Sequence, residues 1–181
     1  MVVNRQRCVP VAVKPLEGFL RRVQHTLRLP AHDVTICLLG DAAMARLNQA
    51  FRGKRGPTDV LSFPANGMRR RRGIRSAEKQ RPGLSAEEGR TQRSASGPAA
   101  PFAASPSSFT SSPSSPPYLG DIAISLQAAR RNARRFTRPL PQELRMLILH
   151  GMLHLAGYDH ETDHGEMDRI ERRLRHRLGL S

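Results

Sequence analysis

Apolar residues along this chain recur at two spacings that alternate from the N-terminus to the C-terminus. Short runs rich in β-branched residues predict strands over 2–13, 34–39, 59–63 and 118–125. Apolar residues three or four positions apart predict five helices between and after them. These residues are Leu16, Phe19, Leu20, Val23 and Leu27; Met44, Leu47 and Phe51; Leu126, Ala129, Ala133 and Phe136; Leu144, Leu147, Ile148 and Met152; and Met167, Ile170, Leu174 and Leu178.

The order of these elements predicts the fold class. Strand, helix, strand, helix, two strands and three helices indicate an α+β domain with a small mixed four-stranded sheet covered by helices. Residues at the helix starts fit this assignment. Asp41 and Ser125 are suitable N-caps, Pro141 suits a first helical turn, and Asp163 with Glu166 resembles a capping box.

Residues 66–117 break the pattern. They begin with four consecutive arginines, Arg69 to Arg72, and continue in Ser, Pro, Ala and Gly with no sustained apolar period. Such a composition buries too little apolar surface to offset the entropy of ordering, so it predicts a disordered insertion between two paired strands. We therefore expect a single domain over 1–181 that this insertion interrupts. The arginine run could contact RNA, or the insertion could be a neutral addition.

The chain carries a formal charge of +15, of which residues 66–117 contribute +6 and the rest +9. This charge favours a polyanionic partner, although a GC-rich genome that prefers Arg would have the same effect. No run of about 18 apolar residues predicts a membrane span. Cys8 and Cys37 lie in apolar surroundings and are expected to be buried thiols, which fits a reducing cytoplasm.

Three histidines at i, i+4 and i+10 are the main chemical signal. His150 and His154 share one face of the predicted helix whose first turn lies near Pro141, and Gly157 can end that helix in a left-handed conformation. The chain can then turn so that His160 approaches the other two. Three imidazoles with one coordination position left open are typical of a catalytic zinc site, located here on a helix and the turn after it.

The same spacing occurs in the long zinc-protease signature H-E-x-x-H-x-x-G-x-x-H, where the glutamate is the general base. Gly151 replaces that glutamate here and cannot accept a proton. Either the site is not a peptidase, or its base comes from elsewhere in the chain.

Three segments resemble the YbeY family of rRNA maturation endoribonucleases. They are 150–160 (HGMLHLAGYDH), 51–64 (FRGKRGPTDVLSFP), which is similar to the family's Y-R-x-x-x-x-P-T-D-V-L-S-F-P block, and 119–125 (LGDIAIS). They occur in the family's order, and the resemblance covers nearly the whole chain outside the insertion. The family's usual connection at the place of the insertion is shorter.

The resemblance implies a zinc-dependent, single-strand-specific endoribonuclease of 16S rRNA 3′-end maturation and ribosome quality control. It implies one zinc on His150, His154 and His160, and Arg52 as the guanidinium that stabilises phosphoryl charge, although a helix-end arginine is the alternative. The expected partners are the single-stranded 16S rRNA precursor, and the ribosome or small subunit with its assembly factors. No membrane and no small-molecule cofactor are expected, and the expected location is cytoplasmic.

Several other assignments stay open at this stage. Lys54 and Arg55 are weaker candidates for RNA backbone contacts, and Asp159 either hydrogen-bonds a ligand imidazole or caps the turn. His164 is an extra ligand or an exposed residue. Two other functions remain: a zinc hydrolase that acts on peptides or small esters, and a ribosome-associated RNA-binding protein with a structural zinc.

Overall fold

The computed structural model describes residues 1–30, 32–65, 116–159 and 163–180. Within them the chain forms four strands and five helices in the predicted order. They are β1 (Val2–Asn4), α1 (Val13–Thr26), β2 (Asp33–Leu39), α2 (Asp41–Arg52), β3 (Val60–Pro64), β4 (Tyr118–Ser125), α3 (Leu126–Arg135), α4 (Leu140–Leu155) and α5 (Glu166–Arg177). The predicted α+β fold with a four-stranded mixed sheet is confirmed. The predicted insertion lies almost entirely outside the described residues.

The sheet has the strand order β1-β2-β4-β3. β2 pairs in parallel with β1 and with β4, whereas β3 pairs antiparallel with β4, from Val60 opposite Ile124 to Pro64 opposite Gly120. The two strands that flank the insertion are therefore neighbours, as predicted. β3 pairs only with β4 among the described strands, so its other edge is available for a cleft.

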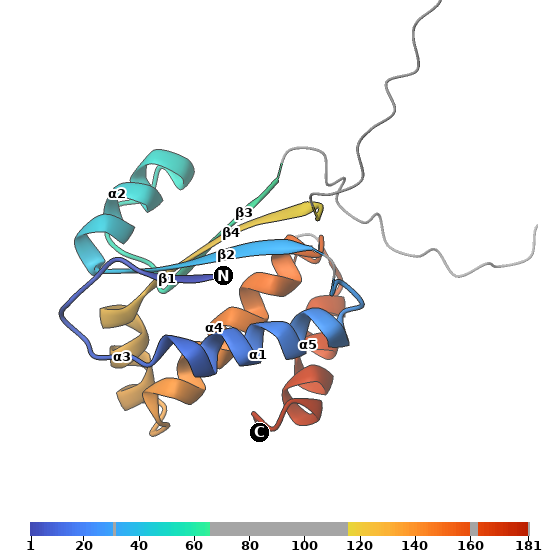
Figure 1. Ribbon diagram of the computed structural model, residues 1–181. Coiled ribbons are helices and arrows are strands. Elements are labelled where there is room, and N and C mark those ends of the chain that lie inside the picture. The colour runs from blue at the N-terminus through green and yellow to red at the C-terminus, as the bar shows by residue number, and fades with distance from the viewer. Residues whose placement is uncertain (31, 66–115, 160–162, 181) are drawn as a thin grey trace, which may run out of the picture. The chain divides into compact units, whose positions relative to one another are not determined.

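Helices cover both faces of the sheet, as Figure 1 shows, with α2 alone on one face and α1, α3, α4 and α5 on the other. The larger core lies between the sheet and these four helices, and it includes Phe19 of α1, Ile122 of β4 and Ile148 of α4, all completely buried. A smaller core under α2 joins Met44 to Leu61 and Ala123. The catalytic candidates on α2 and α4 thus start from opposite faces of the sheet.

The predicted strand over 2–13 is too long. β1 ends at Asn4, and the next residues form a turn that the Gln6 side chain stabilises. Its amide nitrogen donates to Asn4 Oδ1 (3.0 Å) and to the Val9 carbonyl (2.9 Å), while its oxygen accepts from the Val9 amide (2.9 Å). Val9 is buried without being in a strand, and Val13 begins α1, because side-chain hydrogen bonds here replace the sheet ladder.

Two further predictions about single residues differ from the structure. The residue that caps α2 is Gly40, while Asp41 lies in the first turn and accepts hydrogen bonds from Ser125 Oγ (2.5 Å) and Arg131 Nη1 (2.6 Å). Cys8 is exposed and Cys37 half-buried, so neither is the fully buried thiol expected.

The residues predicted at the starts of α3, α4 and α5 are found there in the structure. Ser125 Oγ accepts from the Ala128 amide at the start of α3, and Pro141 lies in the first turn of α4. The Asp163 carboxylate accepts from three amides at the start of α5, although Gly165 is the capping residue. None of the helices in the described part of the chain has the length and apolar content needed to span a bilayer.

Candidate functional site

His150 and His154 occupy the last two turns of α4, on the side that faces a cleft. Their Nε2 atoms are 3.2 Å apart, and the ring centroids are 4.8 Å apart. Two imidazoles on one tetrahedral zinc, each with a Zn–N bond of about 2.0–2.1 Å, place their nitrogens about 3.3 Å apart. The helical i, i+4 spacing therefore brings two ring nitrogens to a separation that one metal ion can bridge.

The turn after α4 follows from Gly157. Gly157 has a φ of +93°, its amide donates to the His154 carbonyl (3.0 Å), and the Tyr158 amide donates to the Leu153 carbonyl (3.1 Å). These two hydrogen bonds define a Schellman motif, which needs a left-handed residue at this position. The chain reverses as predicted, and Gly157, Tyr158 and Asp159 line the same cleft as the histidines.

His160, the third predicted ligand, lies outside the described residues. Within the described part of the chain, no group of three or more His, Cys, Asp or Glu side chains is arranged to hold a metal ion. The described residues thus include two of the three predicted ligands, His150 and His154, and the turn after α4 that precedes the third in the sequence.

A buried carboxylate behind His150 is the functional residue that sequence reasoning missed. Glu171 of α5 is 5% exposed, and its Oε2 lies 3.2 Å from His150 Nδ1. Its Oε1 accepts from Arg175 Nη2 at 2.7 Å. Burial alone raises the pKa of Glu171, but the hydrogen bonds and charges of His150 and Arg175 outweigh it and hold the pKa below its usual range.

This carboxylate is placed to select one tautomer of His150. If Nδ1–H donates to Glu171, the lone pair of Nε2 points toward the cleft, which is the form that binds metals. The sequence contains a signal for this role. Glu171 falls within the apolar stripe of α5 between Met167 and Leu174, where an unpaired acid would be costly.

Gly151 lies where α4 packs closely on the sheet. A Cβ there would come within 2.9 Å of Ile122 Cγ2, 3.0 Å of Ile122 Cδ1 and 3.2 Å of Ser62 Oγ. Ser62 Oγ also donates to the Gly151 carbonyl at 3.3 Å. The position that carries the general base in zinc proteases therefore faces β3 and β4 in this fold, and a side chain there requires Ile122 or α4 to shift.

The structure brings Arg52 into the same cleft as the histidines. The cleft has a volume of about 1010 Å³ and runs along β3, with the end of α2 on one side and the end of α4 on the other. Arg52, the last residue of α2, lines it together with His150 and His154. A sequence block far from α4 in the chain thus places Arg52 at the cleft that His150 and His154 line, while its predicted contact with phosphoryl oxygens stays a prediction.

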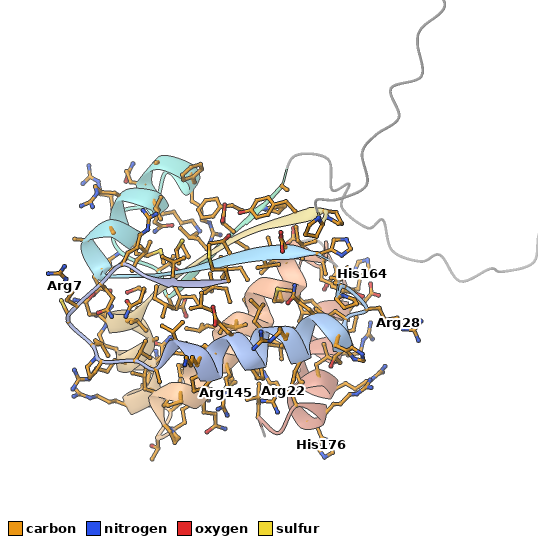
Figure 2. All side chains as sticks on the ribbon, in the orientation of Figure 1. Arg7, Arg22, Arg28, Arg145, His164 and His176 are labelled. Atoms are coloured by element: carbon orange, nitrogen blue, oxygen red, sulfur yellow. The ribbon has the colours of Figure 1, made fainter. Side chains whose placement is uncertain are left out.

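Other candidates have structural partners or lie elsewhere. Asp59 accepts from Asn132 Nδ2 (3.1 Å) and from the Val60 amide (2.9 Å). Lys54 and Arg55 are exposed just beyond the cleft wall. His164 is exposed and does not line the cleft, and Figure 2 shows its side chain at the surface.

Comparison with known proteins identifies the family of this chain. The family model for "Endoribonuclease YbeY" matches residues 3–179. A protein of that name from Solibacter usitatus is 36% identical over 165 residues, which cover 91% of this chain and 78% of the relative. Another, from Koribacter versatilis, is 31% identical over 180 residues, which cover 99% and 86%.

A solved structure has the same fold. The solution structure of a protein from Thermotoga maritima superimposes with a TM-score of 0.52 at 22% sequence identity, covering 98% of this chain and 89% of the other. At this identity the likeness concerns the fold alone. On the extent of the family match and the identity of these relatives, the chain belongs to the YbeY family of endoribonucleases.

Proposed function

We propose that this protein is a zinc-dependent endoribonuclease that cuts single-stranded RNA in 16S rRNA 3′-end maturation and ribosome quality control. The observation that carries the proposal is the pair of Nε2 atoms of His150 and His154, 3.2 Å apart, in a cleft that Arg52 also lines. In this proposal one zinc per chain binds to His150, His154 and His160.

The donor set fits zinc in two respects. Its members are imidazoles, which are borderline-soft ligands, and their separation matches two positions of a tetrahedral site. Glu171 behind His150 completes the carboxylate–histidine arrangement common around bound zinc. A zinc ion held there would supply Lewis-acid chemistry at a phosphoryl oxygen.

The side chains around the metal ligands have separate tasks in this proposal. Glu171 accepts a hydrogen bond from Nδ1–H of His150, and this tautomer leaves Nε2 unprotonated. Arg52 donates from its planar fork to the non-bridging oxygens of the scissile phosphate, where negative charge grows in the transition state. Lys54 and Arg55, both exposed, contact flanking phosphates.

The packing at Gly151 favours a nuclease over the alternative, a zinc hydrolase acting on peptides or small esters. A peptidase of this helix geometry uses a glutamate after the first histidine. Ile122 and Ser62 occupy that space here. A guanidinium in the cleft instead suits a substrate with charged phosphoryl oxygens.

The proposed partners are the 16S rRNA precursor and the small ribosomal subunit with its assembly factors, in the cytoplasm. The formal charge of +15 supports a polyanionic partner. The name that the curated relatives share supports RNA as the substrate.

Metal analysis beside RNA cleavage tests the proposal. The wild type should contain about one zinc per chain and cut a single-stranded oligoribonucleotide but not the same sequence in a duplex. His154→Ala should lose both the metal and the cleavage. His176→Ala is the matched control, because His176 is exposed near the end of α5, away from the cleft (Figure 2).

Three outcomes would contradict the proposal. Full cleavage by metal-free protein would remove the role of zinc, and hydrolysis of casein in place of RNA would favour a peptidase. Loss of RNA or ribosome binding on His150→Ala, with no cleavage by the wild type, would favour an RNA-binding protein in which zinc is structural.

A further inference from the structure

Phe51 is the most exposed aromatic ring among the described residues, and the helical pattern does not explain its exposure. Met44, on the same predicted apolar side of α2, is completely buried, whereas Phe51 is 65% exposed. The smaller core under α2 is formed around Met44, Leu61 and Ala123, and the last turn of the helix extends beyond it. A large apolar side chain has therefore been left at the surface.

One neighbour of the Phe51 ring is a second aromatic ring, on β3. Phe51 packs against Phe63 of β3, with centroids 4.8 Å apart and ring planes at 67°. Both rings line the cleft that also contains Arg52, His150 and His154. The exposed surface of Phe51 therefore belongs to the candidate active site and not to a separate patch.

The charges near Phe51 indicate the kind of molecule that could cover it. Between Gln49 and Thr58 the chain carries Arg52, Lys54 and Arg55 and no acidic residue, and all three cations are exposed. An apolar partner would have to desolvate these cations, whereas single-stranded RNA places phosphates next to bases that stack on aromatic rings. The combination of ring and cations favours RNA.

We propose that Phe51 is a substrate-binding residue on which an unpaired nucleobase of the RNA stacks when the strand occupies the cleft. This inference rests on the proposed function and adds to it a physical reason for single-strand specificity. A base in a duplex is already stacked on both faces and paired, so it cannot reach the ring without being extruded. Every base has a π-face, so the contact selects unpaired RNA with little sequence preference.

The test compares Phe51→Ala, Phe51→Leu and Phe51→Trp in steady-state cleavage of a fluorogenic single-stranded RNA. Loss of one base–aromatic stack weakens binding by about 5- to 150-fold, so Phe51→Ala should raise KM by that factor while kcat stays near the wild-type value. Phe51→Trp should keep the wild-type KM, and Phe51→Leu, which is apolar but has no π-face, should resemble Phe51→Ala.

A matched control and a modified substrate separate stacking from other effects. Phe136→Ala should leave KM unchanged, because Phe136 is also exposed, at 51%, and lies beside Arg135 and Arg138, but does not line the cleft. Moving one abasic nucleotide along the RNA should identify a position at which wild type and Phe51→Ala bind equally well. The melting temperatures of the variants should stay within about 6 °C of the wild type, because the ring is largely exposed and its contact with Phe63 contributes little to stability.

The outcomes distinguish this inference from the proposed function. If the wild type neither binds nor cuts single-stranded RNA, both are wrong. If the wild type cuts the RNA and Phe51→Ala does so with an unchanged KM, only the stacking role is wrong. If Phe51→Leu retains the wild-type KM, the ring makes an apolar contact and stacking is refuted.

Discussion

Replacing Gly151 with alanine tests the close packing of α4 on the sheet. The new methyl group would lie 2.9 Å from Ile122 Cγ2 and 3.0 Å from Ile122 Cδ1. Optimal separation between non-bonded carbons is about 3.5–4.0 Å. Ile122 is completely buried, so the side chain cannot swing into solvent. Either α4 must move away from the sheet or Ile122 must leave its preferred rotamer.

Two opposed contributions set the change in the free energy of unfolding that Gly151→Ala causes. Alanine stabilises a helix interior by about 1 kcal/mol relative to glycine. Overpacking a buried site costs about 1–3 kcal/mol. The net change should be a loss of up to about 2 kcal/mol. For a chain of 181 residues, each kcal/mol shifts the melting temperature by about 2–4 °C, so Tm should fall by up to about 8 °C.

Gly18 provides the matched control. It lies in the interior of α1, and a Cβ at this position would have no atom within 4 Å. Gly18→Ala should therefore gain the stabilisation that alanine gives a helix interior, without the cost of overpacking. Its melting temperature should rise by about 2–4 °C. The difference between the two variants, measured by calorimetry, isolates the contact between α4 and the sheet.

A second substitution identifies the partner in this contact. Ile122→Val removes the Cδ1 atom that lies 3.0 Å from the new methyl group. Ile122→Val should lower the free energy of unfolding less in the Gly151→Ala protein than in the wild type. A double-mutant cycle measures this coupling. If Gly151→Ala raises Tm as much as Gly18→Ala, the close approach is refuted, and with it our explanation for the missing glutamate.

The remaining predictions concern the site and the response to acid. Arg52→Ala should lower RNA cleavage by about 10²-fold or more with zinc content and Tm unchanged, and Arg52→Lys should rescue little; cleavage at the wild-type rate with saturating RNA would contradict the role. Glu171→Gln should weaken zinc affinity by about 10–100-fold, because His150 loses the charged partner of Nδ1; a chelator competition measures this, and unchanged affinity would refute it. Asp41 has a pKa below its ordinary value of 3.8, because Arg131 donates to its carboxylate, so this pair stabilises the fold above that pH, and the stabilisation is lost as pH falls through the lower folded pKa. Urea unfolding between about pH 5 and pH 2 should show a shallower loss of stability for Asp41→Asn than for the wild type, and equal slopes would contradict this.

Features that depend on a few neighbouring residues were predictable from the sequence. The i, i+4 spacing put His150 and His154 on one side of α4, because the helical repeat fixes that geometry. Gly157 ended the helix in the predicted left-handed conformation, and Ser125 capped α3. The mixed sheet followed from the order of strands and helices, and the motifs pointed to the family that the comparisons confirm.

Features that depend on residues far apart in the sequence were decided by the tertiary structure. Phe51 fits the apolar side of α2 by its spacing, yet it is exposed because the core under α2, to which Met44 and Leu47 contribute, does not cover the last turn of the helix. Glu171 became part of the site because the fold packs α5 against α4. The spacing of apolar residues shows which residues of one helix or strand share a face. It does not show how far the elements that pack against that face extend.

At Gly151, the sequence established one fact and the tertiary structure supplied the reason for it. The sequence by itself established that no general base follows His150, because glycine has no side chain. Only the fold supplied the reason, since Ile122 of β4 and Ser62 of β3 fill the space that a side chain would need. These two residues are distant from Gly151 in the chain, and the strand order that brings them together results from packing of the whole domain.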